Sequence, residues 1–193
     1  MKRTFFTVGI GASAGGLNPL SEFFDYLSSD LPAAFVVVTH LSREHPSMLG
    51  SLLSTHTNMP VIRVEHDMDL KPGNIYVLIE NKTLTVKDAR LIVENRDSEI
   101  VNSAVNVFFE SLATDFGAKA IGIILSGGGH DGLDGAKLIN KMGGNVIVQD
   151  PTSAEVNGMP LSIINHDHPT AILNAKDLAL HVNRICFQVE NGD

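Results

Sequence analysis

The chain has 193 residues and a formal charge of −8 at pH 7, which suits a single domain over 1–193 and argues against nucleic acid as a partner. Its one cysteine, Cys186, excludes an internal disulfide, and no Cys-x-x-Cys pair is present to hold zinc. This use of cysteine predicts a cytoplasmic protein. No apolar run approaches the ~20 residues needed to cross a bilayer, so we expect no membrane insertion.

Four continuous apolar runs predict strands that are buried on both faces, as in a parallel sheet. They are "FFTVGI" (5–10), "AFVVVT" (34–39), "AIGIIL" (120–125) and "NVIVQ" (145–149). Amphipathic helical stripes lie between them, at 20–27 and 105–116. This alternation predicts an α/β fold with a doubly wound, mostly parallel sheet, a Rossmann-like three-layer sandwich.

The middle of the chain breaks the pattern. Residues 74–95 hold three short strand-like runs separated by two-residue turns, which predicts antiparallel neighbours. We expect an antiparallel β-hairpin or meander at the edge of the sheet.

Reactive side chains follow three of the predicted strands, where open α/β sheets bind their ligands. Ser13 stands in a Gly-x-Ser-x-Gly turn after the first strand, His40 directly follows the second, and Asp131 lies behind three glycines after the run at 120–125. A serine hydroxyl needs an imidazole to accept its proton and a carboxylate to fix the tautomer of that imidazole. The sequence therefore predicts a Ser-His-Asp triad, although its chain order differs from that of α/β-hydrolases.

The same residues admit other interpretations. A glycine-rich turn after a strand is also typical of nucleotide-binding domains, but these place an acidic residue at the end of the second strand, where His40 stands. Asp134 competes with Asp131, because either carboxylate could serve the triad or cap the following helix. The His-Asp pairs elsewhere lack the spacing of a zinc site, so neither a metal nor another cofactor is expected.

Four motifs together resemble the catalytic domain of the chemotaxis protein-glutamate methylesterases, the CheB family. They are "GIGASAGG", "VVVTHLS", "IILSGGGHDGLDG" and "VQDPTSAEVNGMPLSII", and they cover nearly the whole chain in the family's order. The likeness is closest to the branch found in CheB/CheR fusion proteins. It implies a doubly wound α/β sheet with an antiparallel hairpin, in agreement with the pattern above.

The resemblance also implies roles for individual residues. Ser13 matches the nucleophile, His40 the base and Asp131 the carboxylate that orients it. Backbone N–H groups near Ala14 and Gly128 match the oxyanion donors. The matches to the substrate cleft are Gly158, Met159 and Pro160.

The chain departs from the family pattern at several matching positions, and after His40 it has Leu41 and Ser42 where the family's His-Met-Pro has methionine and proline. Ala14 replaces a frequent threonine, Gly128 replaces the methionine of a Gly-Met-Gly motif, and Asn106 stands where an aspartate is common. Gly128 keeps the backbone donor but loosens its loop, which predicts a less preorganised oxyanion site and a lower rate.

The resemblance implies a serine esterase that hydrolyses glutamate γ-methyl esters on the cytoplasmic helices of methylated chemoreceptors and releases methanol. Glutamine deamidation at the same site stays open, as does a methyltransferase or receiver domain on the same or another chain. Because residues 1–193 include no receiver domain, we expect the active site to be open and the rate of ester hydrolysis to be independent of a phosphodonor. The alternatives are a nucleotide-binding domain and a catalytically weak relative that binds receptors.

Overall fold

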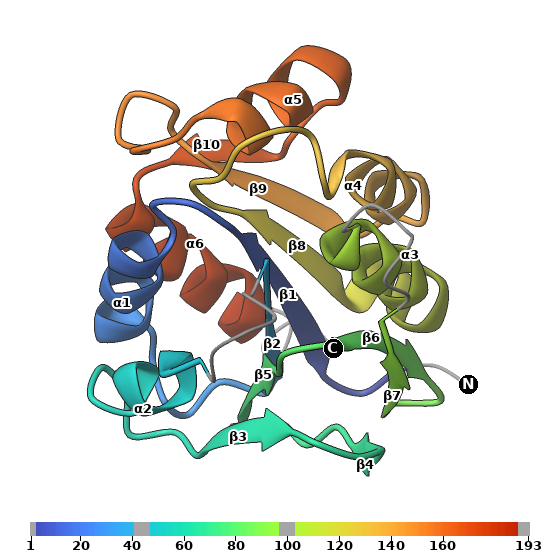
Figure 1. Ribbon diagram of the computed structural model, residues 1–193. Helices are drawn as coiled ribbons and strands as arrows, with labels where there is room; N and C mark the ends of the chain where they lie inside the picture. The colour runs from blue at the N-terminus through green and yellow to red at the C-terminus, as the bar shows by residue number, and fades with distance from the viewer. Residues whose placement is uncertain (1–2, 41–46, 97–102, 189–193) are drawn as a thin grey trace.

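A computed structural model describes residues 3–40, 47–96 and 103–188 (Figure 1). A seven-stranded sheet forms its centre, in the order β10-β9-β8-β1-β2-β5-β3, with every neighbouring pair parallel. Its strands are β1 (Phe6–Ala12), β2 (Ala33–Thr39), β3 (Val61–Val64), β5 (Ile75–Leu78), β8 (Ala120–Ile124), β9 (Asn145–Gln149) and β10 (Ala171–Leu173). The predicted doubly wound α/β fold is confirmed.

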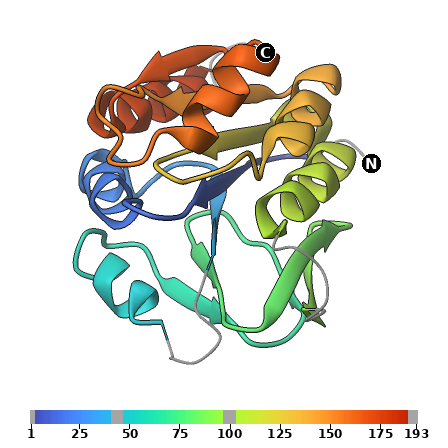
Figure 2. The same ribbon diagram turned by 45° about the horizontal axis from the view of Figure 1, so that its top comes forward.

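Helices cover both faces of this sheet, as Figures 1 and 2 show. One face packs against α1 (Leu17–Tyr26), α2 (Leu49–Leu53) and α6 (Ala175–Gln188). The other packs against α3 (Ala104–Phe116), α4 (Leu133–Lys141) and α5 (Gly158–His166), with a 3₁₀ turn at Gly117–Lys119 after α3. The buried side chains accordingly form two apolar clusters, one on each side of the sheet.

The central strand β1 shows how the sequence sets these layers. Its alternate side chains Phe6, Val8 and Ile10 belong to the cluster beneath α1 and α6. Gly9 lies on the opposite face, where a Cβ atom would come within 3.0 Å of the Phe108 ring. The missing side chain lets α3 lie close to the strand, which sets the distance between α3 and the residues that follow β1.

The middle of the chain differs in part from the prediction. The first run of 74–95 does not pair with the second: it forms β5, which joins the main sheet in parallel with β2 and β3. The other two runs form the antiparallel hairpin β6 (Lys82–Lys87) and β7 (Arg90–Asn95), to which β4 (Met68–Asp69) adds a short third strand. The expected hairpin is therefore present, in a small sheet of its own.

In the part of the chain that the structure describes, no helix is both long and apolar enough to cross a bilayer. The carboxyl ends of β8, β1 and β2 lie side by side, since Ala12 is in register with Thr39 and Gly11 with Ile124. The loops that leave these three strands therefore meet at one rim.

Candidate active site

The structure brings the three predicted triad residues together at this rim. The Ser13 hydroxyl oxygen lies 3.3 Å from Nδ1 of His40, and Nε2 of His40 lies 2.7 Å from Oδ2 of Asp131. The His40 side chain is 22% exposed and that of Asp131 is 7% exposed. The imidazole thus bridges a hydroxyl near the surface and a carboxylate beneath it, and such a line can move a proton away from the hydroxyl.

Asp131 owes its position to the start of α3. Its Oδ2 also accepts a hydrogen bond from the N–H of Val105 at 3.0 Å, and its Oδ1 accepts one from the N–H of Asn106 at 2.9 Å. These two N–H groups belong to the first turn of the helix, where no partner within the helix is available and negative charge is stabilised. The helix therefore orients the carboxylate, and His40 occupies its remaining side.

Asn106 ties the same helix to the loop that carries Asp131. Its side-chain oxygen accepts hydrogen bonds from the N–H groups of Gly132 at 2.9 Å and Gly135 at 3.2 Å, at the start of α4. Gly132 has φ of 101°, a conformation that favours glycine. An amide oxygen accepts these bonds as a carboxylate would, so the departure from aspartate leaves this link intact.

The turn that carries Ser13 is fastened to Ser126, which follows β8. The N–H of Ser13 donates to the carbonyl of Ser126 at 2.9 Å, and the Ser126 hydroxyl lies 2.8 Å from the Ala14 carbonyl. That hydroxyl also accepts a hydrogen bond from the N–H of Val156 at 2.9 Å. Gln149, at the end of β9, accepts from the N–H of Ser126 at 2.8 Å.

Sequence reasoning missed Ser126 and Gln149. Both are buried polar residues at the carboxyl end of an apolar strand, the position that pointed to His40. The same rule, applied to every strand, would have found them.

Two backbone donors beside Ser13 stand free. Among the described residues, neither the N–H of Ala14 nor that of Gly128 has a hydrogen-bond partner. Gly127, next to Gly128, passes so close to Ser13 that a Cβ atom on it would lie 3.0 Å from the Ser13 Cβ. The loop that carries Gly128 thus passes beside Ser13, and free N–H groups next to a reactive hydroxyl can bind the oxyanion that forms when it attacks a carbonyl.

The predicted cleft residues Gly158, Met159 and Pro160 form the start of α5, and the first two contact this loop. A Cβ atom on Gly158 would lie 2.8 Å from the backbone nitrogen of Gly129, and the N–H of Met159 donates to the Gly127 carbonyl at 2.8 Å. The side chains of Met159 and Pro160 are buried. Gly158 and Met159 thus contact the glycine loop beside Ser13.

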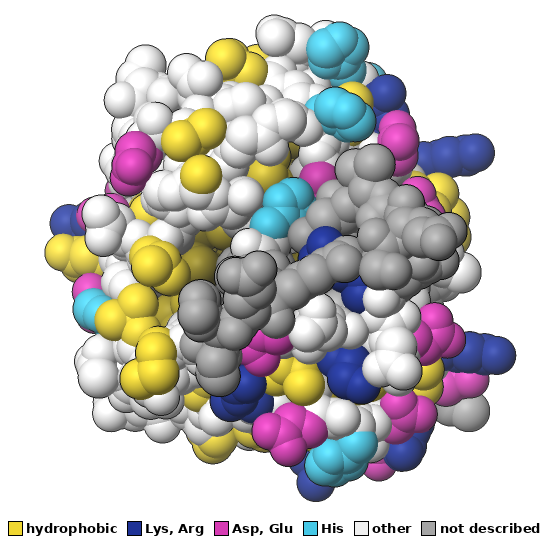
Figure 3. Space-filling model, viewed as in Figure 1, with side chains coloured by type: hydrophobic (Ala, Val, Ile, Leu, Met, Phe, Trp, Pro, Cys, Tyr) yellow, Lys and Arg dark blue, Asp and Glu magenta, His cyan; other side chains and the backbone are white. Residues whose placement is uncertain are grey.

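A cleft of about 400 Å³ opens beside Ser13 and His40, between α1 and α2. Its walls are mostly hydrocarbon, and hydrophobic side chains gather over α1 and α2 on this face (Figure 3). The apolar side chains that line it are Leu17, Leu20, Met48, Leu49 and Leu52. Sequence reasoning did not foresee this cleft.

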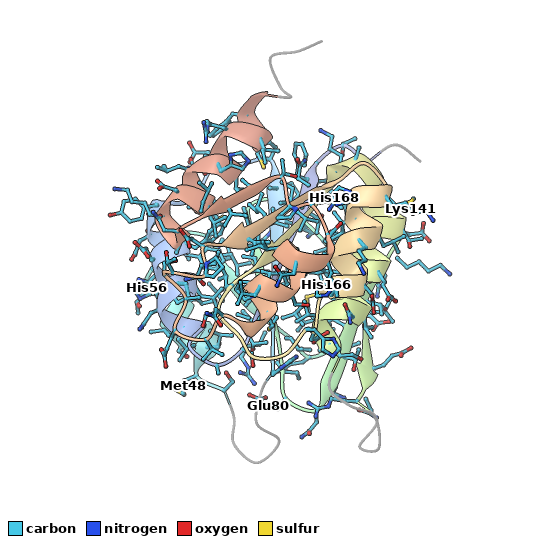
Figure 4. The ribbon with its side chains drawn as sticks, turned by 90° about the horizontal axis from the view of Figure 1, so that it is seen from above. Met48, His56, Glu80, Lys141, His166 and His168 are labelled. Carbon is cyan, nitrogen blue, oxygen red and sulfur yellow. The ribbon has the colours of Figure 1, made fainter. Side chains whose placement is uncertain are left out.

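The wall formed by α2 is held by an ion pair. Glu80 accepts a hydrogen bond from the N–H of Ser47 and lies 3.1 Å from Nη2 of Arg63, whose Nη1 donates to the Ser47 carbonyl. Burial acts to raise the pKa of Glu80, but these donors outweigh it and hold the pKa below its usual value. Met48 and Glu80 lie along the same edge of the molecule (Figure 4).

Other titratable residues form no second site among the residues that the structure describes. No group of three or more His, Cys, Asp or Glu side chains there could hold a metal ion. His166 and His168 lie on and just after α5 (Figure 4), and Asp134 is exposed in the first turn of α4. Burial raises the pKa of the Cys186 thiol to about 12, which leaves it protonated and unreactive.

Comparison with known proteins identifies one family, the CheB methylesterases. A family model described as CheB methylesterase matches residues 8–182. An uncharacterized 104.1 kDa protein of Rhodobacter capsulatus is 35% identical over 116 residues, which are 60% of this chain and 12% of that protein. The protein-glutamate methylesterase/protein-glutamine glutaminase 2 of Methanosarcina acetivorans is 30% identical over 190 residues, covering 92% of this chain and 52% of that protein.

The fold has a close counterpart among solved structures. The crystal structure of the Thermotoga maritima CheB methylesterase catalytic domain matches with a TM-score of 0.86 and 26% sequence identity, over 95% of this chain and 100% of that one. The chain spans about half the length of its Methanosarcina relative. These matches give no support to the nucleotide-binding alternative.

Proposed function

Because the chain belongs to the CheB methylesterase family, we propose that it hydrolyses glutamate γ-methyl esters on the cytoplasmic helices of chemoreceptors. The observation that carries the proposal is the hydrogen-bonded line from Asp131 through His40 to Ser13. The Methanosarcina relative is named for methyl ester hydrolysis and for glutamine deamidation, so deamidation belongs to the proposal as a second reaction of the same site.

The first half of the reaction transfers the acyl group to Ser13. Its Oγ attacks the ester carbonyl while Nδ1 of His40 accepts the hydroxyl proton, and Asp131 stabilises the imidazolium through Nε2–H. The separation of 3.3 Å between Oγ and Nδ1 is long for a hydrogen bond, and such contacts shorten when substrate binds. His40 Nδ1 then protonates the leaving oxygen, which departs as methanol.

The second half releases the product. A water molecule gives its proton to Nδ1 and attacks the acyl carbonyl, and the Ser13 oxygen recovers that proton as it leaves. In both halves the N–H groups of Ala14 and Gly128 bind the oxyanion. Gly158, Met159 and Pro160 shape the substrate cleft, and the contacts of Gly158 and Met159 with the glycine loop beside Ser13 support this role.

The receptor helix lies across the rim where β8, β1 and β2 end, and the protein acts in the cytoplasm, where that helix is found. The 193 residues form one catalytic domain. A receiver or methyltransferase domain, on this chain or another, is the kind of partner that would control access to the rim.

The test is methanol release from a methylated receptor fragment by the parent protein and by Ser13→Ala. We expect the substitution to lower turnover by on the order of 10⁴-fold, because loss of a nucleophile leaves only binding and the oxyanion site. Circular dichroism should show an unchanged fold, since Ser13 is only half-buried in a turn.

Ser29→Ala is the matched control, because Ser29 is an exposed serine in the loop after α1. Its turnover should equal that of the parent. A folded parent protein that releases no methanol would leave only the receptor-binding alternative, and equal turnover by Ser13→Ala and the parent would exclude Ser13 as the nucleophile.

A further inference from the structure

The apolar cleft is much larger than the methyl group of a methyl ester. A methyl group is similar in size to a water molecule, whose share of liquid volume is about 30 Å³. The cleft offers about 400 Å³, within the range of pockets that bind whole small ligands. Methyl ester hydrolysis therefore leaves most of this space unused.

The position of His40 decides which part of an ester faces the cleft. Nδ1 of His40 accepts the Ser13 proton and must later deliver it to the departing alcohol oxygen, so the alcohol part lies beside His40. His40 and Ser13 are both walls of the cleft. The oxyanion donor Gly128 follows β8, on the opposite side of β1 from β2 and His40, and does not line the cleft.

An ester whose carbonyl oxygen points to Gly128 therefore directs its alcohol part toward α1 and α2. There it meets the side chains of Leu20 and Leu49, which are buried, and of Leu52, which is half-buried. Nearer the solvent it passes Leu17 and Met48, which are 54% and 73% exposed. Among the described residues, no Asp, Glu, Lys or Arg side chain lines this path.

We infer that the cleft is an alcohol-binding subsite, and that the protein prefers glutamate γ-esters of larger apolar alcohols to the methyl ester. The inference rests on the proposed function and extends its substrate class. For a butyl ester, the bond between Ser13 Oγ and the carbonyl carbon forms as the bond to the butoxy oxygen breaks. The Ser13 proton passes through His40 to give butanol, and water then frees the acid.

The expected preference follows from the area that the alcohol buries. Each CH₂ group removed from water strengthens binding by about fourfold. A butyl group has three CH₂ groups more than methyl, so full burial would raise kcat/KM by about sixtyfold and half burial by about eightfold. Primary alcohols leave with similar ease, so the chemical step should differ little between the two esters.

The experiment compares two synthetic helical peptides of one sequence that carry a single glutamate γ-methyl or γ-butyl ester. Alcohol release by the parent protein, followed by chromatography, should give a kcat/KM for the butyl ester at least about eightfold above that for the methyl ester. In Leu17→Gln and Leu52→Gln the ratio of the two values should fall by threefold or more, because a polar amide then faces the butyl chain.

Leu180→Gln is the control, because Leu180 is 41% exposed on α6 and lines no part of the cleft. Its ratio should equal that of the parent. A methyl ester hydrolysed as fast as or faster than the butyl ester would overturn the subsite and leave the proposed function standing. Peptides that are not hydrolysed at all would overturn both.

Discussion

Replacing Asp131 by asparagine separates the two roles that the structure gives to this carboxylate. The side chain accepts hydrogen bonds from the N–H groups of Val105 and Asn106 and holds Nε2 of His40. The two N–H groups bind different carboxylate oxygens, and an asparagine in the same position has an NH₂ group in place of one of these oxygens. Whichever way the amide turns, one N–H in the first turn of α3 faces another donor.

The expected loss of stability follows from this one unpaired N–H group. An unpaired buried N–H costs about 1–3 kcal/mol, and for a chain of this length each kcal/mol lowers the midpoint of thermal unfolding by about 2–4 °C. The rate should fall further, by about 10⁴-fold, because His40 loses the charge that stabilises its imidazolium and, in one amide orientation, takes the wrong tautomer. Asp131→Asn should therefore unfold about 2–12 °C below the parent and hydrolyse methyl esters about 10⁴-fold more slowly.

Asp134→Asn is the matched control, since Asp134 is exposed in the first turn of α4, three residues from Asp131. It should keep full turnover and lose at most about 1 kcal/mol of interaction with the helix dipole. Thermal unfolding and methanol release, measured on the parent, Asp131→Asn and Asp134→Asn, show which carboxylate serves the triad. Turnover by Asp131→Asn within tenfold of the parent, or a larger loss in Asp134→Asn, would refute the assignment of the carboxylate.

Three further outcomes test the surroundings of the site. Ser126→Ala leaves the Ala14 carbonyl and the Val156 N–H without their partner, so denaturant titration should show a free energy of unfolding lower by about 1–3 kcal/mol in all. Glu80→Gln should be less stable than the parent at pH 7. Because the pKa of Glu80 is lowered in the folded state, this difference should be complete above about pH 4.3 and shrink as the pH falls through the folded-state pKa. Cys186 should not react with a thiol reagent at pH 8 until the protein is unfolded, because burial raises its pKa to about 12; reaction at the rate of a free thiol would contradict that.

The sequence predicted the position of the site better than its chemistry in detail. Ser13, His40 and Asp131 were found because polar residues after buried strands meet at one rim of a parallel sheet. Which ring nitrogen faces Ser13 depends on the direction from which the imidazole enters, and strand order alone does not specify it. The apolar cleft was missed because it forms between α1 and α2, whose relative placement depends on packing rather than on any local pattern.

The error in the middle of the chain has an identifiable cause. The run Ile75–Leu78 is apolar at every position and buried throughout, which is typical of a parallel strand covered on both faces. The short turn that follows it favoured an antiparallel partner and led to the wrong assignment. In β6 the burial alternates, as expected for a hairpin with one covered face, and there the prediction was confirmed.

The three triad residues follow β1, β2 and β8, which are adjacent in the sheet and buried along their whole length. Amides in such strands exchange their hydrogen atoms with solvent only when the whole domain opens. The alignment of Ser13, His40 and Asp131 is therefore anchored in what should be the slowest-exchanging part of the molecule. Partial loosening of α6 or of the small sheet should leave the ester-cleaving geometry intact, whereas loosening of α3, whose first turn holds Asp131, should abolish activity.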